Sequence, residues 1–358
     1  MQSCKEMFLE LVCAGIGRYC TVPSGSVDWN EIYDLAIKQG LLAVVVDGIE
    51  RFPNEKRPPQ ELLLEWIGEV LQSYEYRYDA YKKIIAEMAG FYNSHGFKMM
   101  VLKGYTCSLD WPRPEHRPCG DIDIWQFGEQ KEADKALASW YKNHGSRLEY
   151  EKGHHHHTVF QWGEFTVENH YDFVNVYAHR SSAEMEKIFK ELGKDDSHSV
   201  EVNGEKVYLP SPNLHALFLI KHMVSHFAAA EINLRQVLDW AFFVKKHTKE
   251  IDWKWLDVML EKYSMKDFVN CINSICVEDL GFDAGIFQEV QFLPALKEKI
   301  LNDILNPEYT SAEPKGFARR FIYKYKRWQG NAWKQRLCYK ESRWEYFWSG
   351  LWAKMLKP

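Results

Sequence analysis

The stretch 117–125, Arg-Pro-Cys-Gly-Asp-Ile-Asp-Ile-Trp, constrains the fold more than any other part of the sequence. Asp121 and Asp123 alternate with Ile122 and Ile124, and a period of two is typical of a β-strand with one buried face. Alternate residues of a strand lie about 6.5–7 Å apart on one side, so the two carboxylates project together and the isoleucines face the core. Because like charges this close repel, one carboxyl pKa should rise unless a cation intervenes.

A divalent cation that prefers oxygen ligands satisfies such a pair most simply. Two magnesium ions about 3.5–4 Å apart suit an in-line displacement at phosphorus. The stretch FTVENHYDF, residues 165–173, supplies a third carboxylate, since Glu168 alternates with His170 on a predicted strand. If this strand lies beside the first, Glu168 reaches the same ions. The alternative is that Asp121 and Asp123 are solvated acids on a surface strand.

The chain of 358 residues is 46% hydrophobic and 15% aromatic, a composition typical of globular and not of disordered proteins. Its patterns predict four segments. Residues 1–95 form an N-terminal helical region, 96–180 an α/β core, 181–310 a C-terminal helical domain, and 311–358 a basic-aromatic helical tail. The predicted fold class is therefore α+β, with a small mixed sheet embedded between helical segments.

The strand signals lie in the core segment. FKMMVLKG, residues 97–104, is a short apolar strand that Gly104 ends, and DIDIWQF, residues 121–127, is a second strand. Residues 129–145 predict an amphipathic helix, and residues 158–173 predict a hairpin.

The hairpin predicts which histidines face Glu168. A two-residue turn at 163–164 sets Val159 opposite Glu168 and His157 opposite His170. The two histidines then share the face of Glu168, where they could contact substrate, assist proton transfer or only hydrogen-bond this carboxylate.

A zinc enzyme is not favoured by the sequence. The run His154–His157 leads into a strand, where consecutive side chains point to opposite faces, so the four histidines cannot all bind one metal ion. The eight cysteines are scattered, with no CxxC pair, and are expected to be reduced thiols.

In their order, these motifs resemble the polymerase-beta-type nucleotidyltransferase superfamily. Its plan is a strand ending in a glycine turn, a helix, a strand with alternating aspartates, and a later single carboxylate. More narrowly, VLKG, HRPCGDIDI, the His-rich strand, VENHYDF and the helix LRQVLDWAFF are similar to the bacterial group of uncharacterised nucleotidyltransferases. The resemblance covers roughly residues 30–250 and identifies the segment 96–180 as the nucleotidyltransferase core.

The resemblance implies that Asp121, Asp123 and Glu168 are the catalytic residues and the ligands of Mg2+ or Mn2+. It also implies that Gly104 begins the loop facing the triphosphate of a bound NTP. The superfamily has Gly-Ser at this loop, whereas this sequence has Lys103 followed by Gly104. Lys103 is predicted to replace the serine as a point charge for phosphate.

Arg117 and Gly120, just before the aspartates, complete the predicted nucleotide-binding set. Arg117 could steady a phosphate or pin the acids, or it could form a structural salt bridge to Asp121 or a loop carbonyl. Arg235 and Asp239 lie one helical turn apart and can pair along one helix face. In the resembling group this helix packs over the nucleotide domain, so Arg235 could instead reach toward the acids.

The charge of the chain is unevenly distributed. Residues 315–358 hold twelve Lys and Arg against two Glu, a net charge of +10, so the remainder of a chain with an overall charge of −5 carries −15. Aromatic residues interleave with these cations. This tail is predicted to pack against its own chain, to bind an anionic membrane surface, or to bind RNA.

Two functions agree with these features. The first is a magnesium-dependent nucleotidyltransferase that moves an NMP group from an NTP to a hydroxyl or phosphate acceptor. The second is a catalytically impaired nucleotide-binding or partner-binding protein on the same scaffold, which Lys103 in place of serine favours. No motif identifies the acceptor or the oligomeric state. Acidic and basic residues interrupt the first apolar run, so the expected location is cytoplasmic, or membrane-peripheral if the tail binds lipid.

Overall fold

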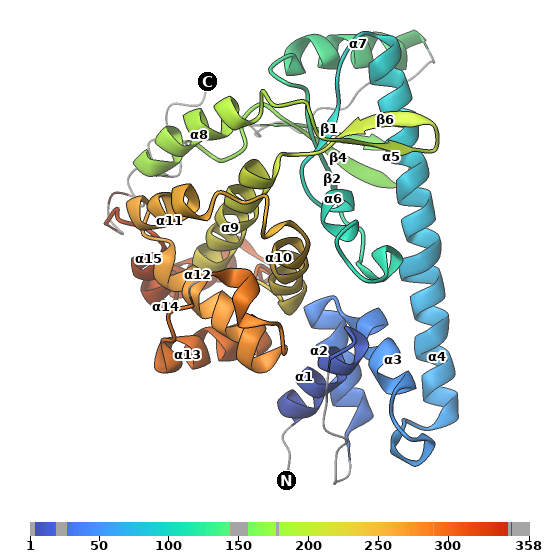
Figure 1. The fold of residues 1–358 in the computed structure, drawn as a ribbon, viewed down its shortest axis with the longest axis vertical. Helices are drawn as coiled ribbons and strands as arrows, with labels where there is room; N and C mark the ends of the chain where they lie inside the picture. The colour runs from blue at the N-terminus through green and yellow to red at the C-terminus, as the bar shows by residue number, and fades with distance from the viewer. Residues whose placement is uncertain are drawn as a thin grey trace. The chain divides into compact units, whose positions relative to one another are not determined.

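The computed structural model describes residues 4–18, 27–143, 157–176, 179–288, 290–342 and 345 (Figure 1). His154–His156 and the tail residues 343–344 and 346–358 lie outside this part of the chain. Contacts divide the chain into two compact units. Unit 1 consists of Met1–Glu75, Asp110–Pro118 and Leu219–Lys340, and unit 2 of Tyr76–Leu109, Cys119–Phe218 and Glu341–Pro358. The four segments expected from the sequence stay a prediction.

Unit 2 holds a six-stranded mixed sheet, which confirms the predicted α+β class. The strand order is β3-β4-β2-β1-β6-β5. The central strand β2 pairs antiparallel with β1 and parallel with β4. The strands are β1 (Met100–Val101), β2 (Ile122–Trp125), β3 (His157–Trp162), β4 (Phe165–His170), β5 (Ser199–Val202) and β6 (Glu205–Tyr208).

The register of the β3–β4 hairpin confirms the prediction. Val159 lies opposite Glu168, and His157 lies opposite His170. In the parallel ladder between β2 and β4, Asp123 is the direct partner of Glu168. The sheet therefore places the two carboxylates side by side on neighbouring strands.

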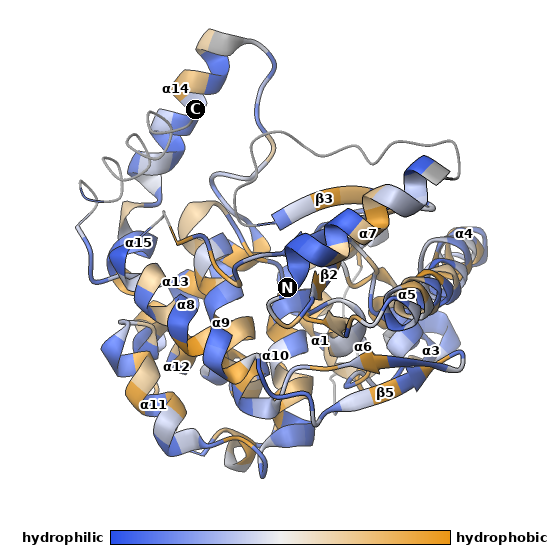
Figure 2. Ribbon diagram, turned by 90° about the horizontal axis from the view of Figure 1, so that it is seen from above, coloured by the Kyte–Doolittle hydropathy of each residue, from blue (hydrophilic) through white to orange (hydrophobic). Residues whose placement is uncertain are grey.

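One face of this sheet is buried under α5 (Arg77–Ser94) and α7 (Gln130–Asn143). α7 carries both hydrophilic and hydrophobic residues (Figure 2), as expected for a helix with one side on a sheet. Ile122 and Ile124 are fully buried in this core. Because side chains alternate along a strand, Asp123 must face the other side of the sheet.

The segment 181–310 was expected to be helical, yet it also contributes a hairpin. β5 and β6 pair antiparallel on either side of Asn203 and Gly204, both of which have positive φ. An Asn-Gly pair between short alternating stretches is a strong hairpin signal, because both turn residues must adopt the left-handed region. The remaining helices of unit 2 are α6 (Tyr105–Ser108) and α8 (Arg180–Leu192).

Unit 1 is helical in its described part. A long helical segment begins there as α4 (Gln60–Val70), passes through a π-helical segment, η2 (Leu71–Tyr76), and continues as α5. α9 (Pro212–Ala229) begins in unit 2 and ends in unit 1. The other α-helices of unit 1 are α1 (Cys4–Gly15), α2 (Trp29–Gln39), α3 (Leu42–Glu50), α10 (Leu234–His247), α11 (Trp253–Lys262), α12 (Lys266–Ser274), α13 (Pro294–Leu305), α14 (Phe317–Gly330) and α15 (Ala332–Cys338).

Its shorter helical turns are η1 (Asn54–Lys56), η3 (Pro114–His116), η4 (Ile275–Asp279) and η5 (Ala284–Phe287). Among the described residues, no helix has the length and apolar character needed to cross a membrane. The seven cysteines in this part of the chain are free thiols.

The core of unit 2 generates a stability prediction. Replacing Ile124 by alanine removes fully buried methyl groups and leaves a cavity, so the free energy of unfolding should fall by about 2–5 kcal/mol. Val258→Ala on α11, where the valine is 57% exposed, should change it by less than about 0.5 kcal/mol. Urea denaturation of the two variants measures both values, and equal losses would contradict this packing.

Candidate functional site

The face of the sheet opposite the α5–α7 core carries the acids. Asp123 is fully buried in the middle of β2, and Glu168 stands beside it on β4 with a quarter of its side chain exposed. His170 follows Glu168 by two residues and therefore shares its face. The strand alternation predicted from the sequence thus brings one buried and one half-buried carboxylate next to an imidazole.

Two cationic groups hold Asp123. Lys103, just after β1, donates from Nζ to Asp123 Oδ1 over 3.0 Å, and His170 donates from Nε2 to the same oxygen over 3.0 Å. His170 Nε2 also lies 3.5 Å from Glu168 Oε2. The second oxygen, Asp123 Oδ2, is buried and has no hydrogen-bond partner among the described residues. A buried carboxylate oxygen needs a partner, and a bound ligand or an ordered water molecule can supply one.

These contacts decide the charges of the site. Burial raises the pKa of Asp123, but Lys103 and His170 outweigh it and lower the pKa to about 2. Burial lowers the pKa of His170, yet its hydrogen bonds to Asp123 and Glu168 raise the pKa to about 9. The hydrogen bond from His170 lowers the pKa of Glu168. At neutral pH, two carboxylates therefore face an ammonium and an imidazolium group.

His170 has an acceptor on both ring nitrogens, as an imidazolium requires. Its Nδ1 lies 3.3 Å from the backbone oxygen of Asp172. Asp172 in turn accepts a hydrogen bond from Lys190 of α8. The loop after β4 is thus tied to a helix, and it orients the ring toward Asp123.

Asp121 lies immediately before β2 and is exposed. Burial of part of its carboxyl raises its pKa, as do the charges of Glu168 and Asp123, while Lys103 opposes this rise. Asp121 is therefore electrostatically coupled to both other acids, as expected for alternate positions on one face.

Asp121 is held in position by a buried tyrosine, which the sequence patterns did not identify. Tyr81 of α5 is fully buried, and its hydroxyl donates to the backbone oxygen of Asp121 over 3.0 Å. A Cβ atom at Gly104 would lie 2.4 Å from this hydroxyl, and Gly104 has a φ of +69°, so glycine is required there on both counts. Arg77, one helical turn before Tyr81, donates to the backbone oxygen of Cys119 over 3.4 Å. The spacing of four residues between Arg77 and Tyr81 was the signal available in the sequence, because residues four apart share a helix face.

The other residues predicted in unit 2 lie around this cluster. His157 Nε2 is 4.0 Å from Glu168 Oε1, and the rings of His157 and His170 are 5.3 Å apart. Gly120 is exposed, and a Cβ atom placed on it would meet no described atom within 4 Å. The backbone before the aspartates is therefore open to an approaching ligand.

Arg117, Arg235 and Asp239 belong to unit 1. Arg117 makes a bidentate salt bridge with Asp239, at 2.8 Å from Nε to Oδ1 and 2.9 Å from Nη2 to Oδ2. Trp111 Nε1 donates to Asp239 Oδ1 over 2.9 Å. Arg117 and Asp239 are both buried. A buried bidentate Arg–Asp pair has the geometry of a structural salt bridge, and its acidic partner is Asp239, not Asp121.

The cluster around Asp123 has the donor atoms of a metal site. Asp123, Glu168 and His170 each offer one ligand atom, and these atoms lie within 4.8 Å of one another. Together with the orphaned Asp123 Oδ2, two carboxylates and an imidazole suit a divalent cation such as Mn2+, and the carboxylates suit Mg2+. The residues therefore fit a metal ion, on the condition that His170 gives up its proton before it binds.

Comparison with known protein families matches residues 25–281 to the family described as "uncharacterised nucleotidyltransferase". The matched region contains the acids Asp121, Asp123 and Glu168, together with His170 and Gly104. No curated protein and no solved structure matches the chain.

The imidazolium of His170 makes stability depend on pH. Because its pKa is raised in the folded state, its contribution is complete below about pH 6.5 and is lost as the pH rises through about 9. In the absence of metal ions, the wild-type protein should lose roughly 3 kcal/mol more than His170→Gln over this range. Urea denaturation with a chelator at both pH values measures the difference. His198→Gln, an exposed histidine of the same unit, should keep the wild-type pH dependence; an unchanged dependence in His170→Gln would contradict the assignment.

Proposed function

Because the chain belongs to the uncharacterised nucleotidyltransferase family, we propose that it transfers an NMP group from an NTP to a hydroxyl or phosphate acceptor, with Mg2+ or Mn2+ as cofactor. The observation that carries the proposal is the buried, partnerless oxygen of Asp123 beside Glu168 and His170. A family membership alone names the reaction class. This oxygen supports Asp123 as a ligand of the cation that this class needs.

Asp123 and Glu168 would hold the metal ion, with His170 as a further ligand once it is neutral. Asp121 lies outside this group of ligand atoms, and its carboxyl interacts electrostatically with Glu168 and Asp123. A bound divalent ion lowers the pKa of the acceptor hydroxyl and stabilises negative charge on the phosphates. The chain itself contributes fixed charges around the fully buried carboxylate of Asp123, where electrostatic interactions are stronger than in water.

Lys103 has the properties of a phosphate ligand. Its side chain is 27% exposed, while its ammonium group contacts the buried carboxylate of Asp123. We expect Lys103 to exchange Asp123 Oδ1 for a triphosphate oxygen when an NTP binds. An ammonium group offers three donors as a compact charge, which suits phosphate oxygens.

The proposed reaction is a single displacement at the α-phosphorus of the NTP. The acceptor oxygen attacks the α-phosphorus and forms a new O–P bond, the bond from this phosphorus to the bridging oxygen breaks, and pyrophosphate leaves with that electron pair. The proton of the acceptor hydroxyl passes to solvent or to a nearby carboxylate. Asp121, whose pKa is raised by burial and by its acidic neighbours, is the carboxylate of this cluster best suited to accept it.

One observation favours the alternative function. Lys103 and His170 already neutralise Asp123, so the acids are stable without any metal ion. In that case the protein is a nucleotide-binding or partner-binding protein that has lost turnover. Release of pyrophosphate separates the two functions, because a binder retains the NTP unchanged.

Asp123→Asn tests the proposed reaction. With Mg2+ and a mixture of NTPs, the wild-type protein should release pyrophosphate, and the variant should do so at least about 100-fold more slowly because it loses the central carboxylate. Asp79→Asn, at an exposed position on α5, should keep the wild-type rate. NTP binding by the wild-type protein without pyrophosphate release would establish the alternative.

Lys103→Met tests the exchange at the ammonium group. Without its positive charge, the affinity for NTP should fall about tenfold, while the affinity for Mn2+ should rise because a competing cation is gone. Calorimetric titration measures both constants, and Lys103→Arg should keep the affinity for NTP within a few-fold. An unchanged affinity for both ligands in Lys103→Met would show that Lys103 is only structural.

A further inference from the structure

The basic tail is not uniform, because its two described helices differ in burial. α15 packs into unit 1: Lys334 is 1% exposed, and its Nζ lies 2.6 Å from Asp303 and 2.7 Å from the backbone oxygen of Ala230. Trp333 contacts the ring of Phe227. α14, by contrast, is exposed over most of its circumference. The packing predicted for the tail therefore holds for α15 and leaves α14 to be explained.

α14 carries an apolar stripe on its exposed side. Ala318, Phe321, Ile322 and Tyr325 follow the spacing i, i+3, i+4, i+7, which places them on one helix face. Phe321 is 68% exposed, and Ile322 and Tyr325 are each 54% exposed. Hydrophobic and hydrophilic residues are interspersed along this helix (Figure 2). Helices of soluble domains usually bury such a stripe, so its exposure calls for a partner.

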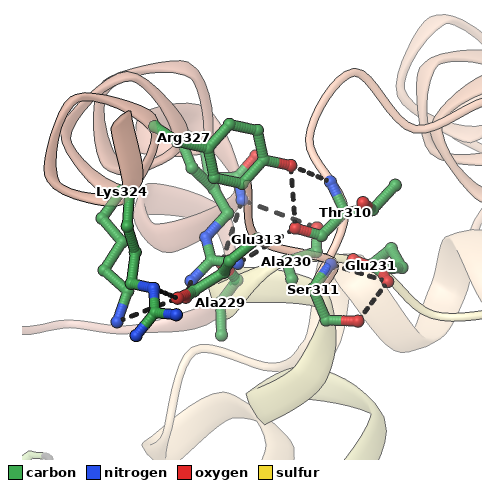
Figure 3. Close-up of polar contacts among 11 residues, drawn as sticks. Ala229, Ala230, Glu231, Thr310, Ser311, Glu313, Lys324 and Arg327 are labelled. Atoms are coloured by element: carbon green, nitrogen blue, oxygen red, sulfur yellow. Dashed lines mark hydrogen bonds and ion pairs between the residues drawn. The ribbon is translucent and has the colours of Figure 1, made fainter. Parts of the chain in front are cut away.

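Polar contacts hold the opposite side of α14 in place (Figure 3). The hydroxyl of Tyr323 donates to the backbone oxygen of Thr310 over 3.0 Å and accepts from its N–H over 2.9 Å. Glu313 binds three cations of the helix, Arg320, Lys324 and Arg327, at 3.2–3.5 Å. The helix is thus anchored without its apolar stripe, which stays available on the outer surface.

The charge of α14 indicates the chemistry of its partner. Its 14 residues include five Lys and Arg and no acidic residue. Arg319 and Lys326 are both exposed and lie beside the apolar stripe on the helix circumference. The last residues of the chain, 343–358, also carry more basic than acidic groups, so charge does not favour them as the cover of this helix.

We propose that the exposed face of α14 docks on an anionic lipid bilayer. Phe321, Ile322 and Tyr325 would enter the boundary between headgroups and acyl chains, while the flanking Arg319 and Lys326 would contact anionic headgroups. Ile322, an aliphatic member of the stripe, distinguishes this partner from RNA, since its side chain offers no ring for a base to stack on. This inference is independent of the proposed reaction.

Vesicle flotation with the full chain tests the proposal. The protein should float with vesicles of phosphatidylcholine and phosphatidylglycerol, and much less with phosphatidylcholine alone, and added salt should weaken the binding. Arg319→Glu combined with Lys326→Glu should lower the partition coefficient about tenfold or more. Phe321→Ser combined with Ile322→Ser should lower it by at least as much, because burial of two large side chains is lost.

Matched variants control for surface changes in general. Leu64→Ser on α4, where the leucine is 59% exposed, and Lys135→Glu on α7, whose side chain is 79% exposed, should float like the wild-type protein. Circular dichroism confirms that each variant is folded. Absence of flotation with anionic vesicles would overturn the proposal, and so would equal losses in the control variants. Binding of single-stranded RNA that the α14 variants abolish, without vesicle binding, would assign the face to RNA.

Discussion

The carboxylate of Asp123, fully buried among the strands of a six-stranded sheet, is the constraint on which the rest of the site depends. An isolated charge in such a place is unstable, so the protein must supply positive charge. It does so with Lys103 from the end of β1 and with His170 from β4, both on one carboxylate oxygen. The other oxygen has no donor in the described structure. That asymmetry connects the electrostatics of the fold with the proposed reaction, because the two protein cations stabilise the carboxylate through one oxygen and leave the other oxygen for the proposed metal ion.

The scaffold explains why these groups meet. The isoleucines on either side of Asp123 enter the core under α5 and α7, and this fixes which face the acid takes. Parallel pairing of β2 with β4 then sets Glu168 beside it. On the same helix α5 that covers the core, Tyr81 binds the backbone of Asp121 and leaves space only for glycine at position 104. Core packing and the loop expected to face a triphosphate are therefore linked through one helix.

Much of this arrangement was predictable from the sequence. Period-two alternation gave the faces of β2 and β4, and a two-residue turn at 163–164 gave the register that places His157 opposite His170. Local patterns did not show that Lys103 and His170 share an oxygen of Asp123, because that depends on how three strands pair. For the same reason, Arg117 and Asp239, which are 122 residues apart, could not be recognised as partners. The Asn203-Gly204 hairpin was a local signal that the helical patterns around it concealed. Likewise, the sequence pattern does not show that α14 is exposed and α15 is buried. That difference depends on tertiary contacts, which α14 makes with Glu313 and α15 makes with Asp303.

The most direct test of the central claim is a crystal structure of the protein soaked with Mn2+ and a non-hydrolysable NTP, with the anomalous scattering of manganese used to locate the ion. The account predicts an anomalous peak for a manganese ion coordinated by Asp123 Oδ2 and Glu168. It also predicts that the Lys103 ammonium group has moved from Asp123 to a phosphate oxygen. An intact contact between Lys103 and Asp123 in a nucleotide-bound structure, with no manganese at these carboxylates, would contradict it.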